Sequence, residues 1–386
     1  MARKTKKRRT GLIILGKIDY SILIITAILL VWGLLTLLSA SAPKSLSESG
    51  NSYSYVKKQI MAMGLGLGAM VVLSFVDYRV YAKLKWLIYF VCGAMLLLVG
   101  LFGVGDEAGI GARRWFDIGP ASVQPSEFAK VGYILFYAAY FSEEIEKGTI
   151  NKFWRGVLFP IILLAPMVGF VYFLQNHFSA TILMVAITFV QMFAAGANIG
   201  YMFGLGGLGG MGIITYLATK GGFRLERIMT WRNIESDKIG KGYQINQSLY
   251  AIGSGGPFGR GFGNSNQKYL YLPESENDFI FSILAEEMGF IGCFGVIILY
   301  LVFIWRGLFL ATRAEDKLGS LIATGIVVMI GLQALVNIAV VTNTIPVTGM
   351  PLPFFSYGGS AMIANLMAIG ILLSISRHAK KEERDR

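Results

Sequence analysis

IDYSILIITAILLVWGLLTLLS, from Ile18 to Ser39, is the stretch of sequence that decides the class of fold. About 20 consecutive apolar residues are enough for a helix to cross the hydrocarbon core of a bilayer. The run is too long for the apolar region of a cleaved signal peptide, and many similar runs follow it. We therefore interpret it as the first transmembrane helix of a membrane protein.

The composition extends this interpretation to the whole chain. Hydrophobic residues make up 54% of the 386 residues, charged residues make up only 15%, and the mean hydropathy is +0.58. Because backbone polar groups in lipid must be satisfied within their own segment, the apolar runs should be helices. We predict an all-α, polytopic integral membrane protein with about ten transmembrane helices, near residues 18–41, 57–76, 84–104, 126–142, 155–174, 178–196, 199–218, 279–306, 318–345 and 354–376.

Basic residues indicate how the helices cross the membrane. The net charge is +12, and the two tails carry much of it, so the charge does not require nucleic acid as a partner. Basic residues usually mark the cytoplasmic side, and an even number of spans places both tails there. The predicted organisation is a single membrane domain with a basic cytoplasmic tail over 1–17, helices 1–7 over 18–218, a large extracytoplasmic loop over 219–278, helices 8–10 over 279–376 and a cytoplasmic tail over 377–386.

Cations also gather in the predicted outer segments. Arg113 lies between the third and fourth helices, and Arg227 and Lys268 lie in the large loop. One interpretation is a solvated surface whose acidic residues nearly balance the charge, and the other is a site for an anionic ligand at the outer leaflet. The glycine-rich run Gly253–Gly263 in the large loop is either flexible or lets backbone approach a ligand closely.

Polar residues at membrane depth are costly and are therefore candidates for function. Gln124, Ser126, Glu127 and Lys130 lie at the start of the fourth helix, where Pro125 suits the first turn. Glu127 and Lys130 are three residues apart, so they share a helix face and could form an ion pair. Such a pair would tie the helix to its neighbours, and a role in ligand binding is the alternative.

A second acidic group surrounds the start of the eighth helix. Asp278 is the last charge before that helix, which makes it a candidate N-cap and a candidate general base. Glu286 and Glu287 follow about 12 Å further along, at a rise of 1.5 Å per residue. Adjacent acids in a membrane helix need partners or water. Lys130 would be a packing partner, and a hydrated cavity that opens toward Asp278 is the functional alternative.

Three prolines interrupt the helical pattern between the ninth and tenth helices, in the segment Pro346–Ser360. A broken helix in a membrane protein is tolerated only where it is buried or lines a cavity. The pattern favours a substrate pocket that includes Ser356, Tyr357 and Ser360, with a simple re-entrant turn as the alternative.

At these residues the sequence resembles the SEDS family (shape, elongation, division, sporulation), whose members include FtsW, RodA and SpoVE. The resemblance covers nearly the whole chain and looks nearest to the FtsW and SpoVE type. Its motifs are Gln124-Pro125-Ser126-Glu127, Gly242-Tyr243-Gln244, Gly261-Phe262-Gly263-Asn264-Ser265, Leu272-Pro273-Glu274 to Asp278-Phe279-Ile280-Phe281 with Glu286-Glu287, and Pro353 to Ser360.

The resemblance implies a ten-helix peptidoglycan glycosyltransferase of the bacterial cytoplasmic membrane. It would polymerise lipid II, a disaccharide pentapeptide on undecaprenyl pyrophosphate, in division, sporulation or elongation. A class B penicillin-binding transpeptidase and other division or elongation membrane proteins would be its partners, and Asp278 would be its catalytic residue. The candidate substrate-binding residues are Arg113, Gln124, Ser126, Glu127, Lys130, Arg227, Gln244, Lys268, Glu286, Glu287, Ser356, Tyr357 and Ser360. A divalent cation, Mg or Mn, could assist, but no ligand spacing commits to one.

One position departs from the family pattern. Such proteins commonly show Gln-Pro-Asp-Leu-Gly-Thr after the fifth helix, whereas this chain reads Gln175-Asn176-His177-Phe178-Ser179-Ala180. His177 replaces the carboxylate, which puts a charge-dependent role at this position in doubt. We expect the position either to tune the reaction or to be a simple interfacial residue.

Two other classes of function share these sequence features. A lipid flippase or transporter would also contain broken helices and intramembrane acids, and it would move its substrate without glycan growth. A non-catalytic scaffold that recruits a transpeptidase would not need Asp278. The family motifs favour the enzyme, and without them the transporter would rank first.

Overall fold

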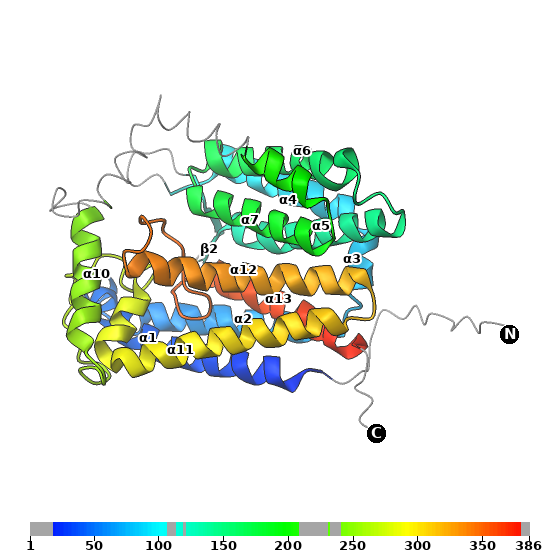
Figure 1. The fold of residues 1–386 in the computed structure, drawn as a ribbon. Coiled ribbons are helices and arrows are strands. Elements are labelled where there is room, and N and C mark those ends of the chain that lie inside the picture. Colours follow the sequence, from blue (N-terminus) through cyan, green and yellow to red (C-terminus); the bar gives the residue numbers. More distant parts are fainter. Residues whose placement is uncertain (1–17, 106–112, 119–120, 208–230, 232–240, 380–386) are drawn as a thin grey trace, which may run out of the picture.

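A computed structural model of the protein describes residues 18–105, 113–118, 121–207, 231 and 241–379. These residues form a bundle of long helices that lie side by side, with one helix, α10, across an end (Figure 1). The elements are α1 (Tyr20–Ser49), α2 (Ser54–Phe75), α3 (Arg79–Lys83), α4 (Lys85–Phe102), β1 (Phe116–Ile118), β2 (Ala121–Val123), α5 (Pro125–Glu146), the π-helical η1 (Phe153–Leu158), α6 (Phe159–Gly169), the π-helical η2 (Phe170–Leu174), α7 (Phe178–Ala194), α10 (Lys241–Gly255), α11 (Ile280–Arg313), α12 (Lys317–Val341) and α13 (Gly359–His378).

The apolar runs form helices as predicted. In the described part of the chain, seven helices are long and apolar enough to cross a membrane, and the shorter apolar helix α7 accompanies them. The charged helix α5 is buried along most of its length, so protein rather than lipid surrounds it. The seventh predicted span, 199–218, begins as a helix and then passes outside the described residues. The count of ten therefore stays a prediction.

Side-chain caps explain where two of the long helices begin. Asp19 accepts hydrogen bonds from the backbone N–H groups of Ser21 and Ile22 at the start of α1, at 2.9 and 3.4 Å. Asp316 accepts one from Gly319 at the start of α12, at 2.9 Å. A short acidic side chain satisfies N–H groups that the first helical turn leaves unpaired. The starts of α1 and α12 therefore follow from the local sequence.

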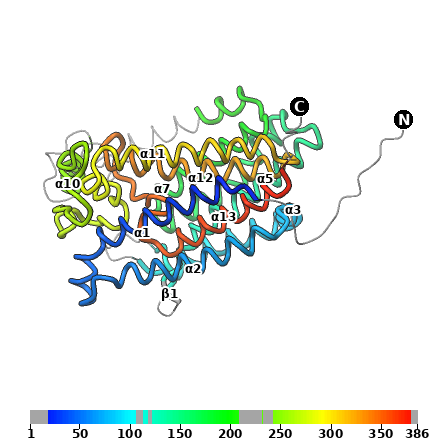
Figure 2. The backbone as a smooth tube through the Cα atoms, turned by 90° about the horizontal axis from the view of Figure 1, so that it is seen from below, coloured from blue at the N-terminus to red at the C-terminus, as the bar shows by residue number. Residues whose placement is uncertain are grey.

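The start of α1 and the end of α13 meet at the same end of the bundle. The backbone N–H of Asp19 donates to Ser376 Oγ at 3.0 Å, and Arg306 pairs with the Asp19 carboxylate at 2.9 Å. Arg79 and Asp316 form another ion pair, at 2.9 Å, between the start of α3 and the start of α12. The α10 helix lies at the opposite end, and two views at right angles agree on this (Figures 1 and 2).

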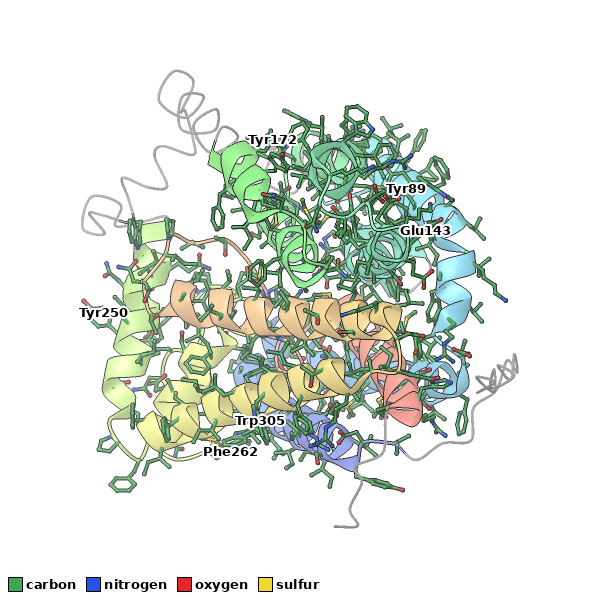
Figure 3. All side chains as sticks on the ribbon, turned by 45° about the vertical axis from the view of Figure 1, so that its right-hand side comes forward. Tyr89, Glu143, Tyr172, Tyr250, Phe262 and Trp305 are labelled. Atoms are coloured by element: carbon green, nitrogen blue, oxygen red, sulfur yellow. The ribbon has the colours of Figure 1, made fainter. Side chains whose placement is uncertain are left out.

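Small residues bring the central helices close together. Helix α13 packs against α2, where a Cβ atom at Gly370 would lie 2.6 Å from the carbonyl oxygen of Met70. Small residues permit such close backbone approach in membrane bundles, where no hydrophobic force drives the helices together. Large apolar side chains cover the outside: Trp305 on α11 is 64% exposed, and Figure 3 shows it on the outer side of that helix. This surface suits contact with lipid.

Helix α11 is broken, and a loop of the same chain fills the break. Gly289 has φ 67° and ψ −166°, which are not helical values. The carbonyls of Glu286 and Glu287 accept hydrogen bonds from the N–H groups of Arg260 and Gly261 at 2.9 and 3.0 Å. On the other side of the break, the N–H groups of residues 290 and 291 donate to the carbonyls of residues 256 and 257. The glycine-rich run therefore approaches the backbone of α11, where we had allowed for a ligand.

Two elements lie in segments that the sequence analysis had treated as loops. Helix α10 and the hairpin of β1 and β2 both fall there, and the hairpin pairs Asp117 with Ser122. The helix is amphipathic and packs against α11, and the hairpin is only three residues long in each strand. Neither shows the long apolar run that revealed the other helices.

Candidate active site

Asp278 lies at the end of the bundle that carries α10, two residues before α11 begins. Phe279 occupies the N-cap position of α11, and no side chain caps this end. The N-cap interpretation of Asp278 is therefore wrong. Among the described residues, no donor forms a hydrogen bond to its carboxylate, and the side chain is half-buried. A carboxylate that caps no helix and accepts no hydrogen bond from the described residues is free to act on a ligand.

Burial and charge set the protonation of Asp278, which lies outside the membrane-spanning segments. Burial, and to a smaller extent the negative charge of nearby Glu274, raises the pKa of the Asp278 carboxyl to about 7. Arg114 opposes this effect because its positive charge favours the ionised carboxylate. The pKa that results suits a general base at neutral pH, since such a base must release and accept its proton there.

Arg114 is the cation that the structure brings near Asp278, whereas the sequence analysis had singled out its neighbour, Arg113. The guanidinium of Arg114 donates to the carbonyls of Gln175 at 3.0 Å and Asn176 at 2.7 Å. These bonds hold it in the turn before α7. Arg113 instead donates to the carbonyl of Leu101 at 2.7 Å on the exposed side. Two adjacent arginines cannot be told apart by sequence, because the path of the backbone decides which one faces the site.

Glu127 and Lys130 form the predicted ion pair on α5. Their charged atoms are 2.8 Å apart, and both side chains are at least 95% buried. Ser126, next to them, is also buried, and its hydroxyl has no partner among the described residues. The pairing on one helix face is confirmed, while the binding role of these residues stays a prediction.

His177 lies just before α7, near the two cations Arg114 and Lys130. Burial, with smaller contributions from the positive charges of Arg114 and Lys130, lowers the pKa of its imidazole to about 3. The ring is therefore neutral at physiological pH. Its Nδ1 atom is buried and has no hydrogen-bond partner among the described residues. A neutral ring here is consistent with the expectation that a charge-dependent role at this position is in doubt.

The segment between α12 and α13 packs against the backbone around Asp278. Ser356 Oγ donates to the carbonyl of Asn277 at 2.6 Å, and the N–H of Tyr357 donates to the carbonyl of Glu276 at 2.9 Å. Ser360 lies further on, where its hydroxyl accepts a hydrogen bond from the N–H of Gln124 at 2.9 Å. Three of the predicted site residues thus contact other protein groups at this end of the bundle.

Glu286 is enclosed by the loop that fills the break in α11. Its carboxylate pairs with Arg260 at 3.1 Å and accepts a hydrogen bond from the hydroxyl of Ser265 at 2.5 Å. The backbone N–H groups of Asn266 and Gln267 complete the set at 3.0 and 3.2 Å. The carboxylate is 99% buried on its side-chain surface and fully engaged. The expected hydrated cavity is therefore not present at Glu286 in the described part of the chain, because protein groups surround its carboxylate.

Glu287 is the centre of a second buried cluster. Lys268 Nζ lies 3.1 Å from its carboxylate, donates to Ser39 Oγ at 2.9 Å and donates to the carbonyl of Gly263 at 2.5 Å. An ammonium group has three N–H donors, and all three are used. The expected contact of Lys268 with a pyrophosphate is thus not supported. Lys130 is not the partner of these acids either, because it pairs with Glu127.

Two predicted site residues, Gln244 and Arg227, and the possible metal ion remain to be placed. The side-chain amide of Gln244, on α10, donates to the carbonyl of Pro273 at 3.1 Å. Arg227 lies outside the described residues. In the described part of the chain, no group of three or more His, Cys, Asp or Glu side chains could hold a metal ion. A bound Mg or Mn ion stays a prediction without a defined site.

The apolar helices define a polytopic membrane protein, and the carboxylate of Asp278 defines an acidic site at one end of its bundle. The profile of the family described as Cell cycle protein, which covers FtsW, RodA and SpoVE, matches residues 20–381. The chain belongs to this family. The predicted family is thus confirmed, and so is its class as a peptidoglycan glycosyltransferase.

Individual relatives agree along most of their lengths. Stage V sporulation protein E of Bacillus subtilis (strain 168) is 41% identical over 362 residues, 94% of this chain and 98% of that protein. The protein named "Probable peptidoglycan glycosyltransferase FtsW" of Geobacter sp. (strain M18) is 37% identical over 360 residues, 93% and 96% of the two chains.

Solved structures match as well. A chain from the study "Structural coordination of polymerization and crosslinking by a peptidoglycan synthase complex" has a TM-score of 0.76 at 28% identity, over 93% of this chain and 98% of that chain. The rod shape determining protein RodA of Thermus thermophilus has a TM-score of 0.66 at 27% identity, over 95% and 98%. The higher sequence identities to Stage V sporulation protein E and to the FtsW relative, 41% and 37%, agree with the predicted resemblance to the FtsW and SpoVE type.

Proposed function

We propose that this protein polymerises lipid II into glycan strands at the outer face of the bacterial cytoplasmic membrane, with Asp278 as the general base. The observation that carries the proposal is the half-buried Asp278 carboxylate, which has no donor among the described residues and lies near Arg114. Family membership supplies the reaction class, and this carboxylate supplies a group that can perform its proton transfer.

The chemistry assigns a role to each charge. A sugar hydroxyl of the acceptor attacks the anomeric carbon of the donor, a new C–O bond forms, and the bond from that carbon to the pyrophosphate oxygen breaks. The hydroxyl proton passes to Asp278 as the nucleophile adds. The leaving lipid pyrophosphate takes the electron pair and gains negative charge, which a nearby cation stabilises. Arg114 is the described cation whose charge acts on Asp278, so we assign this role to it.

The proposed orientation places Asp278 outside the cell and both termini in the cytoplasm. Basic tails favour this arrangement, and the contact between Asp19 and Ser376 puts the described ends of α1 and α13 at the same side. A class B penicillin-binding transpeptidase is the proposed partner, together with other division or elongation membrane proteins. The similarity to a chain of a peptidoglycan synthase complex supports this choice.

The decisive experiment is polymerisation of labelled lipid II by the purified protein with its transpeptidase partner. Glycan strands of many repeats are expected from the wild type. A transporter would move labelled lipid II across a vesicle bilayer without chain growth, and a scaffold would do neither. Absence of strands from folded protein bound to its partner would overturn the proposal.

The pH dependence of polymerisation follows from the state of Asp278. Because the base must be ionised and its pKa is raised to about 7, turnover should rise through pH 7 and level off above it. At one pH unit below the midpoint, about a tenth of the plateau rate remains. A pH profile of kcat at saturating lipid II measures this.

A matched variant separates Asp278 from the nearby histidine, whose ordinary pKa also lies close to neutrality. His177→Asn should leave the midpoint unchanged, because burial lowers the pKa of His177 to about 3 and the ring does not titrate between pH 5 and 8. A shift of the midpoint in this variant would assign the titration to His177 instead.

A further inference from the structure

Three consecutive carbonyl groups that lead into Asp278 are each held by a different donor. The carbonyl of Glu276 accepts from the N–H of Tyr357 at 2.9 Å, and that of Asn277 accepts from Ser356 Oγ at 2.6 Å. The carbonyl of Asp278 itself accepts from the side-chain amide of Asn337 at 2.7 Å. The backbone of residues 276–278 is therefore fixed at successive peptide units.

The two side-chain donors are themselves fixed by second hydrogen bonds. Asn337, on α12, is 1% exposed and also donates to the carbonyl of Met350 at 2.7 Å. Ser356 is 6% exposed and accepts from the N–H of Leu352 at 2.7 Å. The same two side chains thus join α12, the segment 350–357 and the backbone at Asp278 into one unit.

The hydrogen-bond donors of these two side chains are all used within the protein. Both amide hydrogens of Asn337 and the single hydroxyl hydrogen of Ser356 are used within the protein. Neither group has a hydrogen left to donate to a sugar or a phosphate. Ser356, which the sequence analysis had assigned to the substrate, therefore acts on the protein.

The position of the Asp278 carboxylate depends on its backbone. No donor in the described part of the chain bonds to the carboxylate, so only the main chain and the packing around it hold its position. The neighbouring segment passes closely, because a Cβ atom at Gly349 would lie 3.1 Å from Asp278 Oδ2. On the other side, Lys44 of α1 pairs with Glu276 at 2.5 Å. A small movement of this backbone would carry the carboxylate with it.

We propose that Asn337 and Ser356 are positioning residues that hold Asp278 in place for proton transfer. The inference rests on the proposed role of Asp278 as the base. A general base acts when its oxygen lies within about 2.6–3.2 Å of the heavy atom that carries the proton, or reaches it through one water. Misplacement of a reacting group by about 1 Å can cost about 100-fold in rate. The two side chains therefore act on turnover through Asp278, without touching the substrate.

The test measures kcat and KM for lipid II polymerisation by the full chain with its partner. Ser356→Ala and Asn337→Leu each remove a donor to this backbone, and we expect kcat to fall about 10- to 100-fold with KM within about 3-fold of wild type. Ser356→Thr restores the hydroxyl and should recover most of the loss. Ser374→Ala is the matched control, because it removes a buried hydroxyl that donates to the carbonyl of Val76 at the opposite end of the bundle. Its kcat should be unchanged.

A pH profile separates positioning from a general loss of stability. When Asp278 is less well held it gains water, so its pKa should fall toward the ordinary value and the midpoint of kcat should move to lower pH. An unchanged kcat, or a loss expressed only in KM, would overturn the inference. So would a failure of both donor variants to fold, judged by thermal unfolding and gel filtration, because the contacts would then serve stability alone. Failure of the proposed function is distinct: wild type would make no strands, or Asp278→Asn would retain full activity.

Discussion

Asp278→Asn is expected to reduce glycan polymerisation to below about 1% of wild type while the protein stays folded. A general base contributes about 100- to 10,000-fold to a rate, and asparagine keeps the shape of the side chain but cannot accept the proton. The assay compares strand formation from labelled lipid II by the two purified proteins with the same partner. Thermal unfolding of both proteins in the same detergent reports whether the fold is intact.

The stability of this variant provides an internal check. The pKa of Asp278 is raised in the folded protein, so the folded state disfavours the ionised form, and this group lowers stability increasingly as pH rises from about 4 toward 7. Asparagine has no charge to bury. At pH 8 the variant should therefore unfold at the same temperature as wild type or at a higher one.

Asp117→Asn is the matched control, because Asp117 is an exposed carboxylate on the hairpin at the same end of the molecule. It should keep full activity. Polymerisation above about half of the wild-type rate by folded Asp278→Asn would refute the assignment of the base.

The second large effect concerns the buried pair of Lys268 and Glu287. Lys268→Met should destabilise the protein by about 3–5 kcal/mol, because it leaves the Glu287 carboxylate buried without its cation. Both side chains are at least 94% buried, and Ser39 of α1 joins the cluster through the ammonium. The pair thus connects α1, the loop of residues 256–268 and the broken helix α11. Chemical or thermal unfolding in detergent measures the loss.

Two comparisons identify the cause of that loss. The double variant Lys268→Met with Glu287→Gln removes both charges and should recover part of the stability, since replacing a whole buried pair costs less than removing one partner. Lys147→Met breaks an exposed pair with Glu143, whose carboxylate keeps Lys85 as a partner, and should change stability by less than about 1 kcal/mol. If Lys268→Met changed stability as little as Lys147→Met does, the buried cluster would not be a structural anchor.

The broken helix α11 also shows why the buried acids looked like functional residues. Two adjacent glutamates in an apolar run normally indicate a substrate or ion pathway. In this protein, their side chains and carbonyls hold the loop that replaces the missing helical hydrogen bonds at Gly289. The acids form part of that local architecture, and the loop in turn leads along the chain to Asp278. Their contribution to activity is therefore expected to be indirect.

The amino-acid sequence by itself determined the features that depend on near neighbours along the chain. The lengths of the apolar runs predict the long helices, because lipid leaves the backbone no partner outside its own segment. Asp19 begins α1 through hydrogen bonds to residues two and three positions on. The pair of Glu127 and Lys130 follows from a spacing that places both on one helix face. The family motifs added the reaction class and the candidate base.

Tertiary structure alone decided which groups meet across the bundle. Arg114 rather than Arg113 faces Asp278, Lys268 rather than Lys130 joins Glu287, and Asn337 bonds to the carbonyl of Asp278 from 59 positions away. No periodicity in the sequence encodes such contacts, because they depend on how the helices pack, how α11 breaks and where each loop crosses. The family motifs made Asp278 the candidate base, whereas the absence, among the described residues, of a side-chain cap at the start of α11 and the donors that hold the backbone of Asp278 emerged only when the packed chain brought distant residues together.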